Sequence, residues 1–185
     1  MARIPYASSE QFAELMLKSG FPGEAPKTNA FLTLAHTPVA GAAALRLVFA
    51  LLTETKLDPK LREIVILRIA QQCEGKYVWD QHVPIAKAAG VTERQIAALE
   101  RGMVGDVFSE RESLAIAFAD KALRGSGPSD RAFAAVRNML SASEIVELLL
   151  LVGYFRMMSG LLTVLGVETE HPFGQELLKL AVWKA

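Results

Sequence analysis

The sequence predicts an all-α fold in a single domain spanning residues 1–185. Helix-capping signatures recur along the chain, apolar residues repeat at helical spacing, and alternating strand patterns are almost absent. A chain of 185 residues is long enough to bury roughly two-thirds of its unfolded surface in one core. No low-complexity tract or linker divides it.

The first quarter of the chain predicts three helices. Ser9 can cap a short helix that ends near Gly20, since glycine readily adopts the left-handed conformation found after helices. The proline- and glycine-containing stretch 21–29 (FPGEAPKTN) predicts a loop. Two helical pieces follow, one around residues 30–36 and one from Pro38 to about residue 53.

The next two predicted helices are separated at Gly75. Asp58 is a good N-cap for the stretch PKLREIVILRIAQQ, and Pro59 occupies the first turn, where a helix tolerates proline. The stretch KYVWDQHVPIAKAAG begins a further helix that ends near Gly90, with Pro84 inside it.

The second half predicts three more capped helices, the loop RGSGPSD, and a last short amphipathic helix in FGQELLKLAVW. The long helix that ends near Gly166 is apolar on nearly every face and must be covered by its own chain or by another subunit. The capping signature, a Ser or Thr followed three residues later by Glu or Gln, occurs at Thr92 with Gln95, Ser109 with Glu112, and Ser141 with Glu144.

Composition excludes several classes of function. Twenty basic residues balance twenty acidic ones, so neither nucleic acid nor an anionic membrane is an expected partner. The apolar run 145–166 carries Glu147 and Arg156, which favours a core helix over a membrane span. A single cysteine suits a reducing compartment, and the N-terminus lacks the pattern of a secretory signal, so we expect a cytoplasmic protein.

Glu63 and His82 are the candidate catalytic residues. Glu63 shares a helical stripe with Ile66 and Leu67, and His82 shares one with Val78 and Ile85. Two ionisable groups on apolar stripes of consecutive helices are a plausible acid-base pair. A histidine on an apolar face is more often a core residue, however, and spacing does not decide whether the pair meets directly or through water.

Glu63 also has structural alternatives, because it could simply pair with Arg62, Arg68 or Arg156. No histidine has a second ligand at zinc-binding spacing, and no phosphate-binding or dinucleotide-binding glycine motif occurs. The sequence therefore predicts neither a metal nor an organic cofactor.

The chain resembles the carboxymuconolactone decarboxylase family, which also contains the alkylhydroperoxidase D proteins. The resemblance covers about residues 29–170, through KLDPKLREIVILRIA, YVWDQHVPIAKAAGVTERQIAAL, FSERESLAIAFADKAL and EIVELLLLVGYFRMMSGLLTVLGVETE. It implies an alkylhydroperoxidase D-like helical bundle that assembles as trimers or hexamers, with the active site on the two helices that carry Glu63 and His82.

The chain departs from both branches of the family. In the peroxidase branch two cysteines fall on Gly75 and Val78, so both redox thiols are missing here. In the decarboxylase branch a Tyr-Glu-Trp-x-x-His pattern falls on residues 77–82, where Val78 replaces the glutamate between Tyr77 and Trp79.

We therefore predict a cofactor-free enzyme in which His82 transfers protons, Glu63 orients it, and decarboxylation is one candidate reaction. The substrate is expected to be a small carboxylated or lactone-like molecule. Tyr77 and Trp79 are candidates to line its pocket, and Arg68 is a candidate to hold a carboxylate. The alternatives are a hydroperoxide reductase like alkylhydroperoxidase D and a non-catalytic member that binds a ligand or forms an assembly.

Cys73 is not expected to be a redox centre. The chain has no second cysteine to resolve a sulfenic acid, and Cys73 lies two positions before the first cysteine of the family pattern. It also sits near a helix C-terminus and beside Glu74, which both disfavour a thiolate.

Overall fold

The computed structural model describes residues 2–21 and 26–171, and these residues contain helices and no strand. The all-α prediction is therefore confirmed for the described part of the chain. Residues 22–25 of the predicted loop and the predicted helix at 173–183 lie outside it. The helices are α1 (Ser9–Ser19), α2 (Asn29–Leu34), α3 (Pro38–Thr53), α4 (Pro59–Gln72), α5 (Lys76–Ala88), α6 (Glu93–Glu100), α7 (Glu110–Leu123), α8 (Asp130–Arg137) and α9 (Ala142–Val164).

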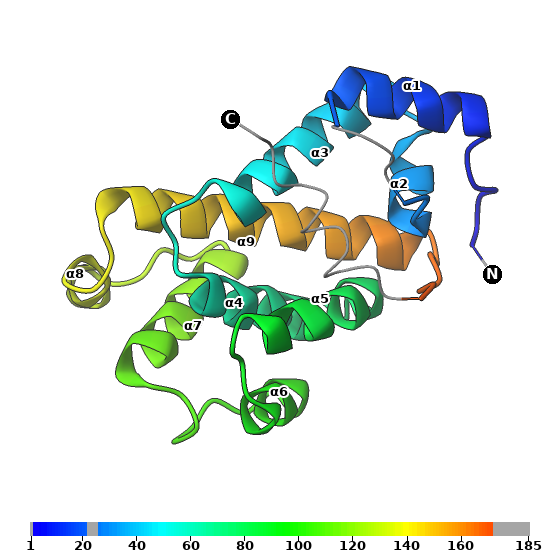
Figure 1. Ribbon diagram of the computed structural model, residues 1–185. Helices are drawn as coiled ribbons and strands as arrows, with labels where there is room; N and C mark the ends of the chain where they lie inside the picture. Colours follow the sequence, from blue (N-terminus) through cyan, green and yellow to red (C-terminus); the bar gives the residue numbers. More distant parts are fainter. Residues whose placement is uncertain (1, 22–25, 172–185) are drawn as a thin grey trace.

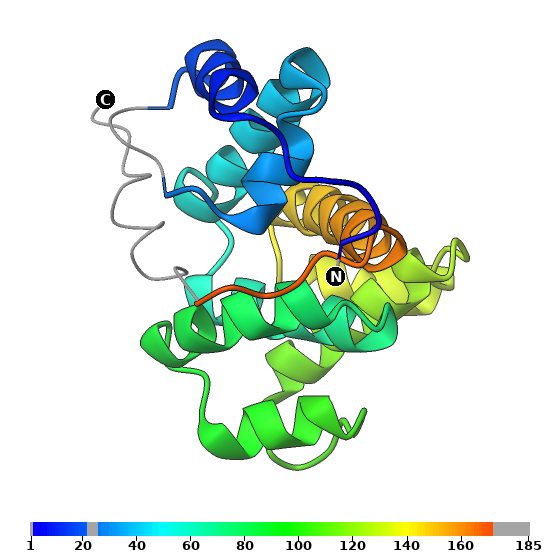
Figure 2. The same ribbon diagram turned by 90° about the vertical axis from the view of Figure 1, so that its right-hand side faces the viewer.

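Helices α4 and α9 lie at the centre of the bundle. Figure 1 shows α9 crossing the middle of the molecule, with α1 to α3 on one side of it and α4 to α7 on the other, and Figure 2 shows the same division from the side. Helix α4 packs against α5, α6, α7 and α9, so every residue from Leu61 to Ala70 is buried. Polar side chains in this stretch therefore need partners inside the protein.

The predicted caps fix where the helices begin. Asp58 accepts a hydrogen bond from the backbone N–H of Leu61, and Pro59 occupies the first turn of α4, as predicted. The three capping boxes of α6, α7 and α9 are present. The cap of α1 was predicted one residue too late, because Ser8 rather than Ser9 accepts the N–H of Gln11.

Helix α8 was not predicted. It begins at Asp130, the last residue of the predicted loop RGSGPSD, and only Val136 within its eight residues is buried, so it contributes little to the core. Its start did carry a signal, since Ser129 caps the helix and Asp130 provides an acidic first turn.

The turn between α4 and α5 is held close to α9. Glu74 adopts a left-handed backbone conformation (φ 52°) at this turn. A Cβ added to Gly75 would collide with the Ser159 side chain, so the close contact between the turn and α9 requires glycine there. This contact places the start of α5 against α9.

Only one face of α9 is covered. Helix α9 is long and apolar enough to cross a membrane by length and composition, and half of its most apolar window is buried within the protein. The remaining apolar side chains form an exposed stripe, interrupted by two exposed glycines. This α9 stripe consists of Val146, Leu149, Leu150, Gly153, Met157, Gly160 and Val164.

Candidate active site

Glu63 and His82 are in direct contact. Nδ1 of His82 lies 2.9 Å from Oε2 of Glu63, across the interface between α4 and α5. Glu63 is fully buried, and the His82 side chain is only 10% exposed.

The charge on Glu63 is balanced within the core. Oε1 of Glu63 accepts a hydrogen bond of 3.2 Å from Nε of Arg62, so its two oxygens have different partners. A carboxylate only accepts hydrogen bonds, so Nδ1 of His82 must carry the proton that it shares with Glu63. Nε2 of His82 is thereby left for another partner, which the described residues do not supply.

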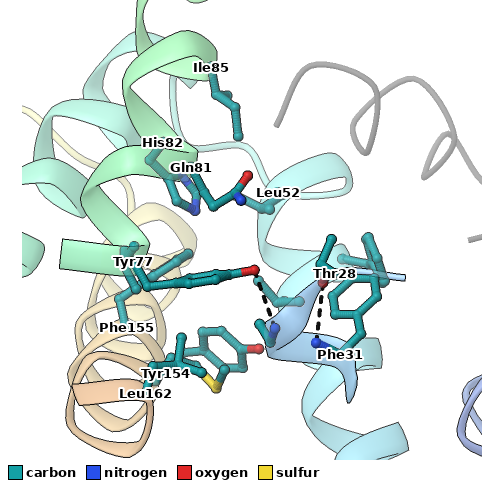
Figure 3. Close-up of a pocket in the computed structure, with 15 residues that line it drawn as sticks. Thr28, Phe31, Leu52, Tyr77, Gln81, His82, Ile85, Tyr154, Phe155 and Leu162 are labelled. Carbon is teal, nitrogen blue, oxygen red and sulfur yellow. Dashed lines mark hydrogen bonds between the residues drawn. The ribbon is translucent and has the colours of Figure 1, made fainter. Parts of the chain in front are cut away.

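His82 lies in the wall of an apolar cavity of about 110 Å³ between α2, α3, α5 and α9. Figure 3 shows His82, Gln81 and Ile85 on one side of this cavity and Tyr154 and Leu162 on the opposite side. The Phe155 ring meets the imidazole edge-on, with 4.9 Å between ring centroids. The other lining residues include Thr28, Ala30, Phe31, Val48, Phe49, Leu52, Tyr77, Val78 and Met158.

Tyr77 borders the cavity, but its hydroxyl is already bonded. It donates to Oε1 of Glu170 at 2.6 Å and accepts from the backbone N–H of Ala30 at 3.3 Å. Burial, together with the Glu170 carboxylate, raises the pKa of Tyr77 well above its ordinary value. Gln81 also donates to Oε1 of Glu170, at 2.9 Å. These bonds tie the chain after α9 to α5 beside the cavity.

Trp79, the other aromatic candidate for the pocket wall, does not border this cavity. Trp79 instead borders two surface grooves, one of which runs beside residues 166–170. A spacing of three residues places two side chains next to each other on a helix, but it does not give them the same neighbours. The cavity faces the side of α5 that carries Val78, His82 and Ile85.

Arg68, the candidate to hold a substrate carboxylate, does not line this cavity. Nε and Nη2 of Arg68 donate to the two carboxylate oxygens of Asp120 on α7, at 2.9 and 2.8 Å. Nη1 donates to the carbonyl of Gly102 and to Gln71. A guanidinium bound in this way joins α4 to α7.

We expect Arg68→Ala to destabilise the fold and leave the site intact. Removing one partner of a largely buried ion pair leaves Asp120 uncompensated, which costs about 3 kcal/mol. Urea unfolding should report this loss, and Asp120→Ala should show a comparable one. Substrate affinity of the folded fraction should not change. A raised KM with unaltered stability would restore Arg68 to the substrate site.

Cys73 lies at the C-terminal end of α4 and does not line the cavity. Burial raises the pKa of its thiol, and the positive charge of Arg156 only partly opposes this effect. A raised thiol pKa leaves little thiolate near neutral pH, and the thiolate is the nucleophile that attacks peroxide. The family position occupied by Val78, in contrast, does face the cavity, with an apolar side chain.

We therefore expect wild type and Cys73→Ser to consume alkyl hydroperoxide equally slowly in an assay with excess dithiol. Rapid consumption by wild type that disappears in Cys73→Ser would show that the cysteine is the reactive centre.

Several lining residues were not predicted from the sequence. Tyr154 and Phe155 lie on α9, where nearly every position is apolar, so periodicity does not single out the face that meets the cavity. Phe31 and Phe49 come from α2 and α3, and they lie far in sequence from the segment around His82 that carries the family resemblance. In the described part of the chain, no three His, Cys, Asp or Glu residues gather in a way that could hold a metal ion.

The arrangement defines an all-helical protein with a buried Glu-His pair beside an apolar cavity. Residues 38–121, which contain both members of the pair, match the model of the Carboxymuconolactone decarboxylase family. This match over residues 38–121 agrees with the resemblance to that family seen in the sequence. Among curated proteins, none matches this sequence.

Solved structures share the fold at low sequence identity. An uncharacterised peroxidase-related protein from Ralstonia eutropha JMP134, with the alkylhydroperoxidase AhpD core, superposes with a TM-score of 0.74 at 18% identity, covering 97% of this chain and 96% of its own. A peroxidase-related protein from Silicibacter sp. TM1040 gives 0.72 at 15% identity, covering 91% and 92%. The debrominase Bmp8, in complex with 2,3,4-tribromopyrrole, gives 0.67 at 16% identity, covering 94% and 90%. The predicted alkylhydroperoxidase D-like fold is confirmed.

Proposed function

We propose that the protein is a cofactor-free enzyme that transfers protons on a small ring-shaped, lactone-like substrate. The observation that carries the proposal is the position of His82, which is bound to Glu63 through Nδ1 and lies in the wall of an apolar cavity. In this geometry Nε2 can remove a proton from a carbon next to a carbonyl group, and the resulting imidazolium can return it elsewhere on the ring. Glu63 stabilises the imidazolium while it exists.

The lining supports an uncharged substrate. Among the described residues that border the cavity there is no lysine, arginine or carboxylate. A carboxylate-bearing substrate would lose its hydration there without gaining a cationic partner, which is unfavourable. A lactone or cyclic ketone meets no such penalty. Of the two substrate types expected from the sequence, carboxylated and lactone-like, we therefore retain the lactone-like type for the proton-transfer reaction.

The cavity volume supports a single ring. An apolar cavity of about 150 Å³ in another protein holds benzene, and the cavity here has about 110 Å³. The complex of the debrominase Bmp8 with 2,3,4-tribromopyrrole, also a one-ring compound, is consistent with ligands of this kind in the fold.

Decarboxylation is the second candidate reaction, and the family match favours it. After carbon dioxide leaves, the carbanion equivalent must be protonated, and in this proposal protonated His82 supplies the proton. An apolar cavity also excludes water from a substrate carboxylate. Hydroperoxide reduction is disfavoured because the two family cysteine positions are occupied by Gly75 and Val78.

A panel of single-ring ketones, lactones, enol-lactones and their carboxylated analogues tests the proposal. Binding should be measured by ligand-observed NMR, and turnover should be followed by the same method. We expect at least one uncharged ring to bind and be converted, and His82→Gln to bind it without converting it. Binding without conversion in wild type would identify a ligand-binding protein, and selective conversion of the carboxylated analogues would identify a decarboxylase.

A further inference from the structure

The hydroxyl of Tyr154 has no hydrogen-bond partner among the residues that the structure describes. Tyr154 is 5% exposed and lines the same cavity as His82. Figure 3 shows its side chain extending from α9 toward the α2 side of the cavity. The fully buried side-chain atoms without a partner, among the described residues, are the Tyr6 hydroxyl and Ser159 Oγ. The unpaired Tyr154 hydroxyl therefore keeps some accessible surface, and it is open to a ligand in the cavity.

Other polar atoms around the cavity are bonded within the protein. The Tyr77 hydroxyl is bonded to Glu170 and Ala30, and Oγ1 of Thr28 accepts the N–H of Phe31 at 3.2 Å. The Gln81 amide donates to Glu170. Nε2 of His82 and the hydroxyl of Tyr154 are therefore the lining groups, within the described part of the chain, that remain available to a ligand.

The surroundings of Tyr154 favour a ligand over a trapped water molecule. A buried water usually makes about three hydrogen bonds to polar groups. The cavity wall is almost entirely apolar, and its other polar groups are already bonded. Burial raises the pKa of Tyr154, so the phenol keeps its proton at neutral pH and can act as a hydrogen-bond donor.

We propose that Tyr154 donates a hydrogen bond to the carbonyl oxygen of a ring-shaped substrate and so selects rings that carry such an oxygen. This inference rests on the proposed function, because it assigns the cavity beside His82 to the substrate. Tyr154 is then a specificity-determining residue, and the substrate class narrows to uncharged single rings with an oxygen acceptor.

The test compares cyclohexanone with methylenecyclohexane, in which a CH₂ group replaces the carbonyl oxygen at nearly the same shape. Affinities of the full-length protein are measured by NMR titration for wild type, Tyr154→Phe and Tyr77→Phe. We expect wild type to bind cyclohexanone about tenfold more tightly, the value of one hydrogen bond of ordinary strength. Tyr154→Phe should abolish this preference and still bind both rings.

Thermal unfolding of the ligand-free proteins provides a second readout. Tyr154→Phe removes a hydroxyl that makes no hydrogen bond within the described part of the protein, so its Tm should not fall. Tyr77→Phe is the matched control, since it removes a bonded hydroxyl from the same cavity, and its Tm should fall.

The outcomes separate this inference from the proposed function. A preference for cyclohexanone that persists in Tyr154→Phe, or a lower Tm in that variant, would overturn the role of Tyr154 and leave the His82 proposal standing. Failure of wild type to bind either ring would count against the cavity as a substrate site, and both proposals would fall.

Discussion

Replacing His82 with alanine is expected to lower kcat by about 10³-fold or more, because the general acid-base group is lost. Glu63→Gln should also lower kcat, by about 10²- to 10⁴-fold, because the amide oxygen can still accept the Nδ1 proton but the negative charge is lost. Both predicted decreases in kcat follow from the 2.9 Å contact between the Glu63 and His82 side chains at the cavity wall. Steady-state kinetics of wild type and both variants, on the first substrate identified, would measure these decreases in kcat.

Two controls separate catalysis from packing in this experiment. His36→Ala removes a histidine on the surface, where it is bonded to the Pro5 carbonyl, and should leave kcat unchanged. Added imidazole should partly restore the activity of His82→Ala by occupying the space of the missing ring. If His82→Ala merely unfolds the protein while the folded fraction keeps full specific activity, His82 is a packing residue.

The second large effect is expected in assembly. We propose that the protein is a homo-oligomer, a trimer or a hexamer, and that the α9 stripe is part of its subunit interface. A contiguous exposed apolar surface marks an interaction site. Apart from the backbone of α9 itself, no atom of the described residues would lie within 4 Å of a Cβ at Gly153 or Gly160, so both positions allow the close approach of a helix from another copy.

Substituting both Leu150 and Met157 with lysine should therefore convert the oligomer to a monomer of 20.1 kDa. The lysines would place unpaired charges in an apolar interface, which is strongly unfavourable. Light scattering after size-exclusion chromatography, at micromolar concentration, measures the change. Leu17→Lys is the matched control, because Leu17 is an exposed leucine on α1, away from the stripe.

A wild-type protein that is already monomeric at micromolar concentration would refute the assembly. A monomer that instead sediments with phospholipid vesicles would assign the α9 stripe to a membrane surface.

Helix boundaries were the most predictable part of this fold, because the determinants are local. Asp58 before Pro59 and the capping boxes at Ser109 and Ser141 each act within four residues, so the sequence alone reveals them. Helix α8 escaped prediction because its eight residues bury little apolar surface, and its stability depends on packing against α7 and α9.

The candidate site was predictable only in part. Glu63 and His82 stood out because ionisable residues on apolar stripes are unusual, and the family resemblance pointed to the same pair. The contact of Tyr77 with Glu170 joins residues 93 positions apart, and no local pattern encodes such a pairing. Tyr154 was not identified because α9 is apolar on nearly all sides, so its sequence does not indicate which side meets the cavity.

The most direct test of the central claim is proton exchange at carbon. A single-ring lactone or ketone that binds the cavity should be incubated in D₂O with wild type and with His82→Gln, and deuterium incorporation next to the carbonyl should be followed by NMR. We predict that wild type accelerates incorporation by at least about 10²-fold over buffer, the scale of general base catalysis, and that His82→Gln does not. Equal incorporation with both proteins and with buffer, while the ring remains bound, would contradict the account.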